Sequence, residues 1–126
     1  MSNICHRLKS AQEFQRDLYE EGYTLFRNTT NVVDWSVVGI ANVGEVEVNK
    51  LAGQLHAERM LNHQQHIPEQ WREFRLLFPR TVWFKDGEYW IAYLYFMDGE
   101  WDLDFCQPDK KNGSGNERVV YIAAIA

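Results

Sequence analysis

Between residues 81 and 105 the hydrophobic positions form β-prone aromatic runs, and a polar Asp-Gly pair interrupts them twice, at Asp86-Gly87 and at Asp98-Gly99. Asp-Gly between β-prone runs is the strongest short-range signal for a hairpin, because a type I′ turn needs positive φ at both central residues. We therefore predict two consecutive tight hairpins. The cross-strand pairs expected from two-residue turns are Phe84 with Tyr89, Trp83 with Trp90, Phe96 with Trp101, and Tyr95 with Asp102.

These hairpins assign each side chain to one face of a sheet, since successive residues of a strand point in opposite directions. One face is almost wholly apolar and collects Trp83, Trp90, Ala92, Leu94, Phe96, Trp101, Leu103 and Phe105. We expect this face to be the core, because leaving it in water would forgo about 2 kcal/mol per large side chain. The opposite face mixes aromatic with acidic residues and collects Val82, Phe84, Tyr89, Ile91, Tyr93, Tyr95, Glu100, Asp102 and Asp104.

Three segments outside the hairpins have a helical pattern. A capping box at residues 10–13 and an apolar stripe after it predict a helix over 11–21, with Gly22 placed for a left-handed C-terminal cap. Apolar residues at helical spacing predict a second helix over 45–65. A third, short helix is predicted from Pro68 to just before Pro79, because three aromatic residues fall on one side of it. These aromatic residues are Trp71, Phe74 and Phe78.

Further β-prone runs predict strands over 23–27, 32–40 and 118–125, and the segment 108–117, rich in Asn, Gly and Lys, predicts a flexible loop. A chain of 126 residues suits one core. We therefore predict a single α+β domain spanning residues 1–126, with a mostly antiparallel sheet of about five strands and two or three helices packed on one face.

Composition narrows the classes of partner. The chain is acidic, with 18 Asp and Glu residues against 13 Lys and Arg, and a formal net charge of −5 argues against a general nucleic-acid binder. No apolar run reaches the length of a membrane-spanning helix, and no signal peptide is recognisable, so we expect no membrane partner and a cytoplasmic location. Cys5 and Cys106 are then expected to be reduced thiols.

Two motifs invite a chemical interpretation that their surroundings do not support. His63 and His66 are spaced as metal ligands, with Glu69 or His56 as a third, but no recognised ligand pattern accompanies them. The segment 39–44 lies between a strand and a helix as a phosphate loop does, yet it lacks the Lys and Ser or Thr that such a loop needs. We therefore predict no metal and no cofactor.

The arginines around the third predicted helix have two interpretations. Arg59, Arg72, Arg75 and Arg80 could form a basic patch. They could equally pair with glutamates on solvated helix faces, which is the interpretation that we favour. The glutamates concerned are Glu58, Glu69 and Glu73.

The face that mixes tyrosines with acids also has two interpretations. It is either a solvated surface whose charges prevent edge-to-edge aggregation, or a recognition surface that binds through aromatic rings and carboxylates. The candidate binding residues are Tyr89, Tyr93, Tyr95, Glu100, Asp102 and Asp104. We expect a small binding or interaction protein, inhibitor-like or immunity-like in its general properties, which binds a protein partner, dimerises with its own copy, or takes a small cationic or polar ligand.

The alternative is a small-molecule-binding pocket protein or a hydrolase-like enzyme built on the same Tyr and Asp residues. Asp102 and Asp104 would stand about 7 Å apart along one strand face, a separation that suits acid and base roles across a water molecule. Such roles require that burial separates the pKa values of the two carboxyls. The sequence gives no sign of that burial, so it does not predict an enzyme.

Overall fold

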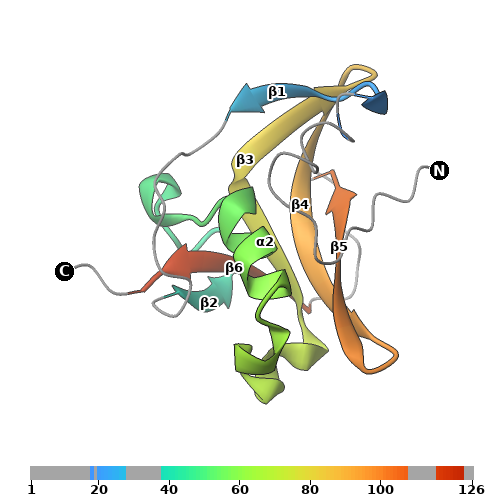
Figure 1. The fold of residues 1–126 in the computed structure, drawn as a ribbon. Coiled ribbons are helices and arrows are strands. Elements are labelled where there is room, and N and C mark those ends of the chain that lie inside the picture. The colour runs from blue at the N-terminus through green and yellow to red at the C-terminus, as the bar shows by residue number, and fades with distance from the viewer. Residues whose placement is uncertain (1–17, 19, 28–37, 108–115, 124–126) are drawn as a thin grey trace.

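Six strands form one mostly antiparallel sheet in a computed structural model that describes residues 18, 20–27, 38–107 and 116–123 (Figure 1). The strands are β1 (Thr24–Arg27), β2 (Val38–Asn42), β3 (Arg75–Lys85), β4 (Glu88–Met97), β5 (Glu100–Cys106) and β6 (Glu117–Ile122). Their order is β2-β6-β3-β4-β5, and β1 also pairs with β3. The mostly antiparallel α+β architecture is confirmed, with six strands where about five were expected.

The two predicted hairpins are confirmed at both turns. Asp86 and Gly87 have φ values of +53° and +77°, and Asp98 and Gly99 have values of +55° and +84°. These positive angles at both central positions are what a type I′ turn requires. All four predicted cross-strand pairs are present: Phe84 with Tyr89, Trp83 with Trp90, Phe96 with Trp101, and Tyr95 with Asp102.

Strand β3 bends in the middle and pairs with different strands on either side of the bend. Its first residues run parallel to the start of β6, and its last residues run antiparallel to β1. The register with β4 shifts between Phe78 and Trp83, a stretch that includes Pro79. Proline has no amide hydrogen to donate, so it is tolerated at such an irregularity. At the bend, Arg80 donates its amide to the carbonyl oxygen of Ala52 at 3.1 Å, and the Ala52 amide donates to Val120 at 2.9 Å.

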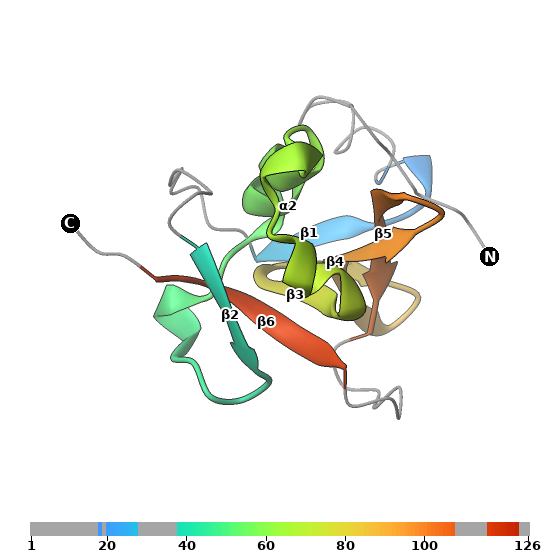
Figure 2. The same cartoon turned by 90° about the horizontal axis from the view of Figure 1, so that it is seen from below.

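The apolar face of the sheet packs under α2 (Gln54–Leu61), which lies across β3 and β4 (Figures 1 and 2). We call this side the core face. Six of its predicted members are buried, and Trp90 and Phe96 are partly buried against the same cluster. The buried six are Trp83, Ala92, Leu94, Trp101, Leu103 and Phe105. The sequence therefore predicted the core side of both hairpins correctly.

The second helix is much shorter than predicted. The sequence indicated 45–65, but α2 begins at Gln54, and only a 3-10 turn, η2 (Val48–Lys50), precedes it. Leu51 forms a β-bridge with Tyr121. Because the backbone around Leu51 bonds to the sheet, it is not available for a continuous helix.

The third predicted helix is wrong in its second half. A 3-10 turn, η4 (Glu69–Glu73), replaces its beginning, and β3 begins at Arg75. Leu76 and Phe78 lie in the core and Leu77 lies in a second apolar cluster on the other side of the sheet, which is the alternation of a strand. Pairing with β4 and β6 on both sides overrides the helical spacing of the aromatic residues. Instead of two or three helices, the described residues contain α2, short 3-10 turns and the helical residues Leu18 and Glu20.

The remaining predictions lie partly outside the described residues. Most of the helix over 11–21 does so, but its predicted cap is confirmed: Gly22 has a φ of +92°, and the Tyr23 amide donates to the Leu18 carbonyl at 2.9 Å. The predicted strand over 32–40 is described only from residue 38, as β2. The loop over 108–117 is described only at its last two residues, and Glu117 already belongs to β6. In the described ranges no helix is long and apolar enough to cross a membrane, and the cytoplasmic location stays a prediction.

Candidate functional site

Two tyrosines of β4 and two aspartates of β5 lie on the side of the sheet opposite α2, which we call the outer face. Tyr93 pairs with Asp104, and Tyr95 pairs with Asp102. The two tyrosine rings lie side by side with their centroids 5.6 Å apart and their planes tilted by 40°. All four side chains are half-buried. The hairpin register therefore brings together four of the six candidate residues.

The other two candidates lie at the ends of this group. Glu100 pairs with Met97 beside the second turn, two cross-strand pairs beyond Asp102 and therefore on the same face. Tyr89 lies at the far end of β4, against the ring of Phe84 at 5.4 Å. Between Tyr89 and Tyr93 the outer face holds Ile91, which is 1% exposed and belongs to an apolar cluster. Tyr89 is therefore separate from the other tyrosines.

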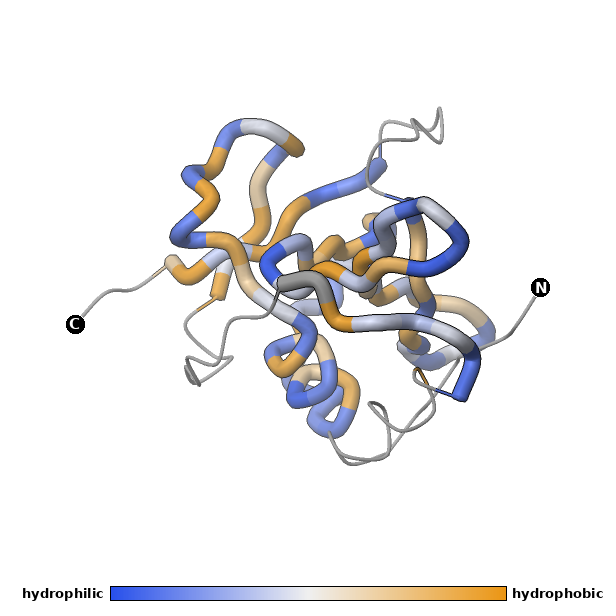
Figure 3. The backbone as a smooth tube through the Cα atoms, turned by 90° about the horizontal axis from the view of Figure 1, so that it is seen from above, coloured by the Kyte–Doolittle hydropathy of each residue, from blue (hydrophilic) through white to orange (hydrophobic). Residues whose placement is uncertain are grey.

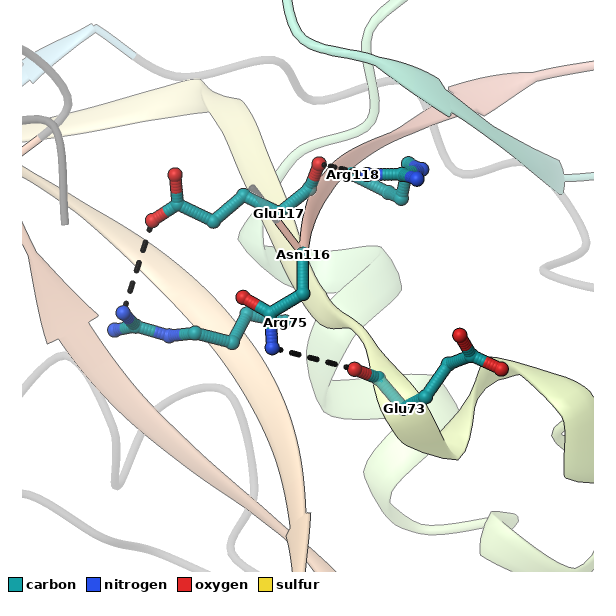
Figure 4. A network of polar contacts seen from close by, with 5 residues as sticks. All are labelled: Glu73, Arg75, Asn116, Glu117 and Arg118. Carbon is teal, nitrogen blue, oxygen red and sulfur yellow. Dashed lines mark hydrogen bonds and ion pairs between the residues drawn. The ribbon is translucent and has the colours of Figure 1, made fainter. Parts of the chain in front are cut away.

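Arg75 lies over Tyr93 on the outer face, although sequence reasoning placed it in a helix among other arginines. Its guanidinium carbon lies 4.2 Å from the centroid of the Tyr93 ring. Its Nη1 atom lies 3.7 Å from a carboxylate oxygen of Glu117, which stands opposite it on β6 (Figure 4). The apolar run Leu76-Leu77-Phe78 was the available signal for a strand buried on both faces, but such a run does not by itself distinguish a strand from a helix.

Backbone contacts hold the start of β3 against the start of β6 (Figure 4). The Arg75 amide donates to the carbonyl oxygen of Asn116 at 3.0 Å, and the Asn116 side chain donates to the carbonyl oxygen of Glu73 at 3.3 Å. The Arg118 guanidinium donates to the carbonyl oxygen of Glu117 at 2.8 Å. These contacts hold the backbones of Arg75 and Glu117 next to each other, where their side chains form the ion pair.

Burial and the positive charge of Arg75 act in opposite directions on the pKa values of three nearby groups: Tyr93, Asp104 and Cys106. Burial raises the pKa of the Tyr93 hydroxyl, and Arg75 opposes that rise. Burial likewise raises the pKa of the Asp104 carboxyl, and the Asp102 charge adds to the rise. The Phe105 amide, which donates to Asp104 at 2.8 Å, and Arg75 both lower that pKa. Burial also raises the pKa of the Cys106 thiol to about 11, so this thiol stays protonated at neutral pH and is a poor nucleophile.

A second polar group, which the sequence did not predict, lies in the core beneath α2. Hydrophilic residues interrupt the hydrophobic ones along this helix (Figure 3), and three of them are buried: Gln54, His56 and Glu58. The Trp83 indole donates to the Gln54 side-chain oxygen at 2.7 Å, and the Gln54 amide nitrogen donates to Glu58 at 3.1 Å. Burial raises the pKa of Glu58 to about 7.

Glu58 therefore does not occupy a solvated helix face, as the sequence had suggested. Of the predicted pairs between arginines and glutamates, Arg72 with Glu69 is present at 3.6 Å. Glu58 bonds to Gln54 instead, four residues earlier on the same helix. Arg75 is no part of a helical basic patch, since it lies on the outer face of the sheet.

The two candidate metal ligands lie near each other at the end of α2. The rings of His63 and His66 have centroids 6.4 Å apart, and His63 donates from Nδ1 to the Arg59 carbonyl oxygen at 2.9 Å. In the ranges that the structure describes, no group of three or more His, Cys, Asp or Glu side chains is arranged to hold a metal ion.

Comparisons of the chain with protein-family models, with curated proteins and with solved structures give no match. The function therefore has to be argued from the site itself.

Proposed function

We propose that this protein acts by binding a protein partner through the outer face of β4 and β5. The observation that carries the proposal is the half-exposed pair of tyrosines, Tyr93 and Tyr95, set beside Asp104 and Asp102 on strands whose other face packs against the core. Tyrosine offers a large contact area at a low cost in side-chain entropy, and it is enriched where proteins bind each other.

The outer face around Tyr93 and Tyr95 is mostly negative, which favours a basic partner. Among the described residues it carries four carboxylates and one guanidinium, that of Arg75. The carboxylates belong to Glu100, Asp102, Asp104 and Glu117. An excess of acid steers a basic surface toward the face and selects against acidic partners.

Exposed apolar side chains extend the face at both ends, which suits a protein better than a small ligand. Met97 is 58% exposed beside the second turn, and the pair of Phe84 and Tyr89 is 38% and 41% exposed beside the first. A strand of ten residues separates the two turns. Apolar and aromatic side chains distributed over this length are typical of protein interfaces.

Site-specific crosslinking tests the proposal. A photoreactive phenylalanine analogue at Met97 should crosslink to a defined protein in the native cell, whereas the same analogue at Val48, which is 56% exposed and belongs to η2, should not. The captured protein is identified by mass spectrometry, purified, and titrated against the isolated chain. Capture of a second copy would assign the face to dimerisation, and equal capture from both positions would contradict the proposal.

Charge reversal gives the matched binding measurement. Glu100→Lys with Asp102→Lys should weaken the purified complex at least tenfold. The same change at Glu45 and Glu47, which are exposed in the segment before η2, should leave affinity within about twofold. Equal weakening by both double variants would indicate an effect of net charge alone and would count against the outer face.

One observation favours the hydrolase-like alternative. Burial raises the pKa of Asp104, which has a second carboxyl, Asp102, two residues away on the same strand face. A carboxyl whose pKa is raised by burial, close to a second carboxyl, is one element of the arrangement that acid and base catalysis uses. Under this alternative Asp104→Asn abolishes hydrolysis of a chromogenic glycoside or ester panel that the parent chain turns over. Absence of turnover by the parent chain leaves binding as the better proposal.

A further inference from the structure

Strand β2 stands at one end of the sheet, and part of its backbone points away from the neighbouring strand. In the described ranges β2 pairs with β6 alone (Figure 2). The Val120 carbonyl oxygen on β6 accepts from the Ala52 amide at 2.9 Å, on the side of β6 that faces β3. Residues opposite each other in an antiparallel pair exchange both hydrogen bonds or neither. Ile40, which stands opposite Val120, therefore directs its amide and carbonyl away from β6.

Three residues of β2 direct their backbone groups to this outer edge. Val38 and Asn42 lie two positions before and after Ile40, so their amides and carbonyls point the same way as those of Ile40. The Asn42 carbonyl oxygen also accepts from the Glu45 amide at 3.2 Å, and a carbonyl oxygen can accept a second hydrogen bond. The edge thus offers a donor and an acceptor at every second residue, which is the spacing that an added strand requires.

Strand β2 lacks the features that keep an exposed strand edge from pairing with another chain. Such edges are usually protected by charged side chains, by proline, or by a cover over the free backbone groups. The edge of β5, at the other end of the sheet, has such protection: Gln64 bonds to the Trp101 backbone, and the Asp104 carboxylate accepts from the Phe105 amide. The sequence of β2, VGIAN, contains neither a charged residue nor proline.

We propose that a second copy of this chain adds its own β2 to this edge, as an antiparallel pair around a twofold axis. Ile40 then faces Ile40 of the second copy, and Val38 faces Asn42, which uses all the outward-directed backbone groups. A twofold pair brings identical strands together, so a charged strand would meet charges of its own sign. Because β2 is uncharged, it pairs with its own copy without that repulsion.

The side chains of β2 suit a strand that has a neighbour on both edges. Val38 and Ile40 pack against the core cluster, and Ala41 packs against the apolar cluster on the other side of the sheet. A side chain at Gly39 would meet the Tyr121 ring at 3.2 Å, so this ring covers Gly39. Joining two copies would continue both apolar layers from one sheet into the next. Since β6 and β3 lie between β2 and β4, this edge is separate from the surface in the proposed function.

Sedimentation equilibrium of the full chain tests the proposal. The parent chain should form a dimer whose fraction rises with protein concentration. Asn42→Pro should weaken this dimer at least about tenfold, because each copy loses an amide donor at the outer edge that the pairing with β6 does not use. Asn42→Ala, which keeps the amide, is the matched control and should stay within about twofold of the parent chain.

Disulfide formation tests the register. With Cys5→Ser and Cys106→Ser as background, Ile40→Cys should link two copies on mild oxidation, because residues that exchange both hydrogen bonds have Cα atoms about 5.5 Å apart. Asn42→Cys should not link them. The two copies of residue 42 stand four residues apart along the paired strands, about 13 Å, which a disulfide cannot span. Circular dichroism shows whether each variant keeps the fold, and the disulfide result decides if Asn42→Pro does not fold.

Three outcomes would overturn the inference. A chain that stays monomeric at all concentrations would show that β2 does not pair with its own copy. A dimer that persists in folded Asn42→Pro, or that Glu100→Lys with Asp102→Lys abolishes, would use another surface. A dimer in which Ile40→Cys forms no disulfide, or forms it no faster than Asn42→Cys, would contradict the register. The crosslink at Met97 tests the proposed function separately in each case.

Discussion

The side-chain amide of Gln64 bonds to both backbone polar groups of Trp101. Its nitrogen donates to the Trp101 carbonyl at 3.1 Å, and its oxygen accepts from the Trp101 amide at 2.9 Å. Trp101 lies on β5, at the end of the strand order, so these backbone groups point away from β4. Gln64 thus takes the place of a neighbouring strand at this position and shields the edge from pairing with another chain.

Removing this side chain should destabilise the fold and expose the edge. We expect Gln64→Ala to lower the free energy of unfolding by about 1–2 kcal/mol, because a part-buried donor and acceptor on Trp101 lose their partners. Self-association should rise at high protein concentration. Chemical denaturation and analytical ultracentrifugation measure the two effects. Gln65→Ala, at the exposed neighbouring position, is the control, and equal destabilisation by both variants would refute this role for Gln64.

Glu58 should make the folded chain less stable as the pH rises, whereas a salt-bridged acid makes a fold more stable as the pH rises. Burial raises its pKa from 4.5 to about 7 in the folded chain. The contribution of Glu58 is therefore fully present below pH 4.5 and decreases as the pH rises toward 7, by about 3 kcal/mol at 1.36 kcal/mol per pKa unit. Glu58→Gln should remove this loss, so that its advantage over the parent chain grows between pH 5 and pH 8. Denaturation curves of the parent chain and of Glu58→Gln at pH 5 and at pH 8 measure this difference.

His56 also makes the stability of the fold depend on pH, with a sign opposite to that of Glu58. Burial lowers the pKa of His56 below 6.5, so its contribution is present above pH 6.5 and decreases as the pH falls. The parent chain sums both effects, whereas the difference between the parent chain and Glu58→Gln isolates Glu58. The exposed Glu45→Gln is the matched variant. A difference for Glu58→Gln that stays constant from pH 5 to pH 8 would show that Glu58 titrates normally.

The hydrogen bond from the Trp83 indole should contribute more to the free energy of unfolding than the one from the Trp90 indole. Trp83→Phe leaves the Gln54 oxygen, at 2.7 Å in the parent chain, without its buried donor, and we expect a loss of about 1–3 kcal/mol in unfolding free energy. Trp90 is only partly buried and donates to Lys85 at a longer distance of 3.4 Å, so Trp90→Phe should cost less. Urea denaturation compares them, and a larger loss for Trp90→Phe would contradict this ranking.

In the second hairpin turn, Gly99→Ala should destabilise the fold, whereas Asp98→Asn should not. Gly99 has a φ of +84° with no atom near its missing side chain, so Gly99→Ala is opposed by backbone strain alone. We expect Gly99→Ala to cost about 1–2 kcal/mol. Asp98→Asn should be close to neutral, because asparagine adopts positive φ readily at this turn position. Thermal unfolding measures both, and a neutral Gly99→Ala would show that the turn can change type.

Local chemistry explains which parts of the fold could be predicted from the sequence. The turn at Asp98-Gly99 fixes the register of β4 and β5 within a few residues, and alternation then assigns Leu94 and Leu103 to the core. The start of β3 was predicted as helix because Trp71, Phe74 and Phe78 have helical spacing. Its strand form depends on pairing with β6, about 40 positions along the chain, and no local pattern contains that contact.

The candidate site was also predicted only in part, because some of its residues depend on contacts that are distant in the sequence. The neighbourhood of Tyr93, Tyr95, Asp102 and Asp104 follows from one hairpin and was predicted. Arg75 was not, because its position on the outer face depends on the strand that was missed. The burial of Glu58 could not be predicted either, since a carboxylate on a helix is normally solvated and its hydrogen bond to Gln54 matters only once α2 lies against Trp83.

The order β2-β6-β3 has a consequence for synthesis on the ribosome. When the two hairpins have left the exit tunnel, β3 still has an open side at residues 75–77, and β2, made much earlier, has no strand to join. β6 pairs with β3 on one side and with β2 on the other, so its arrival unites two separate pieces of the nascent chain. We expect this joining to be the slow step of folding, since it closes the longest loops.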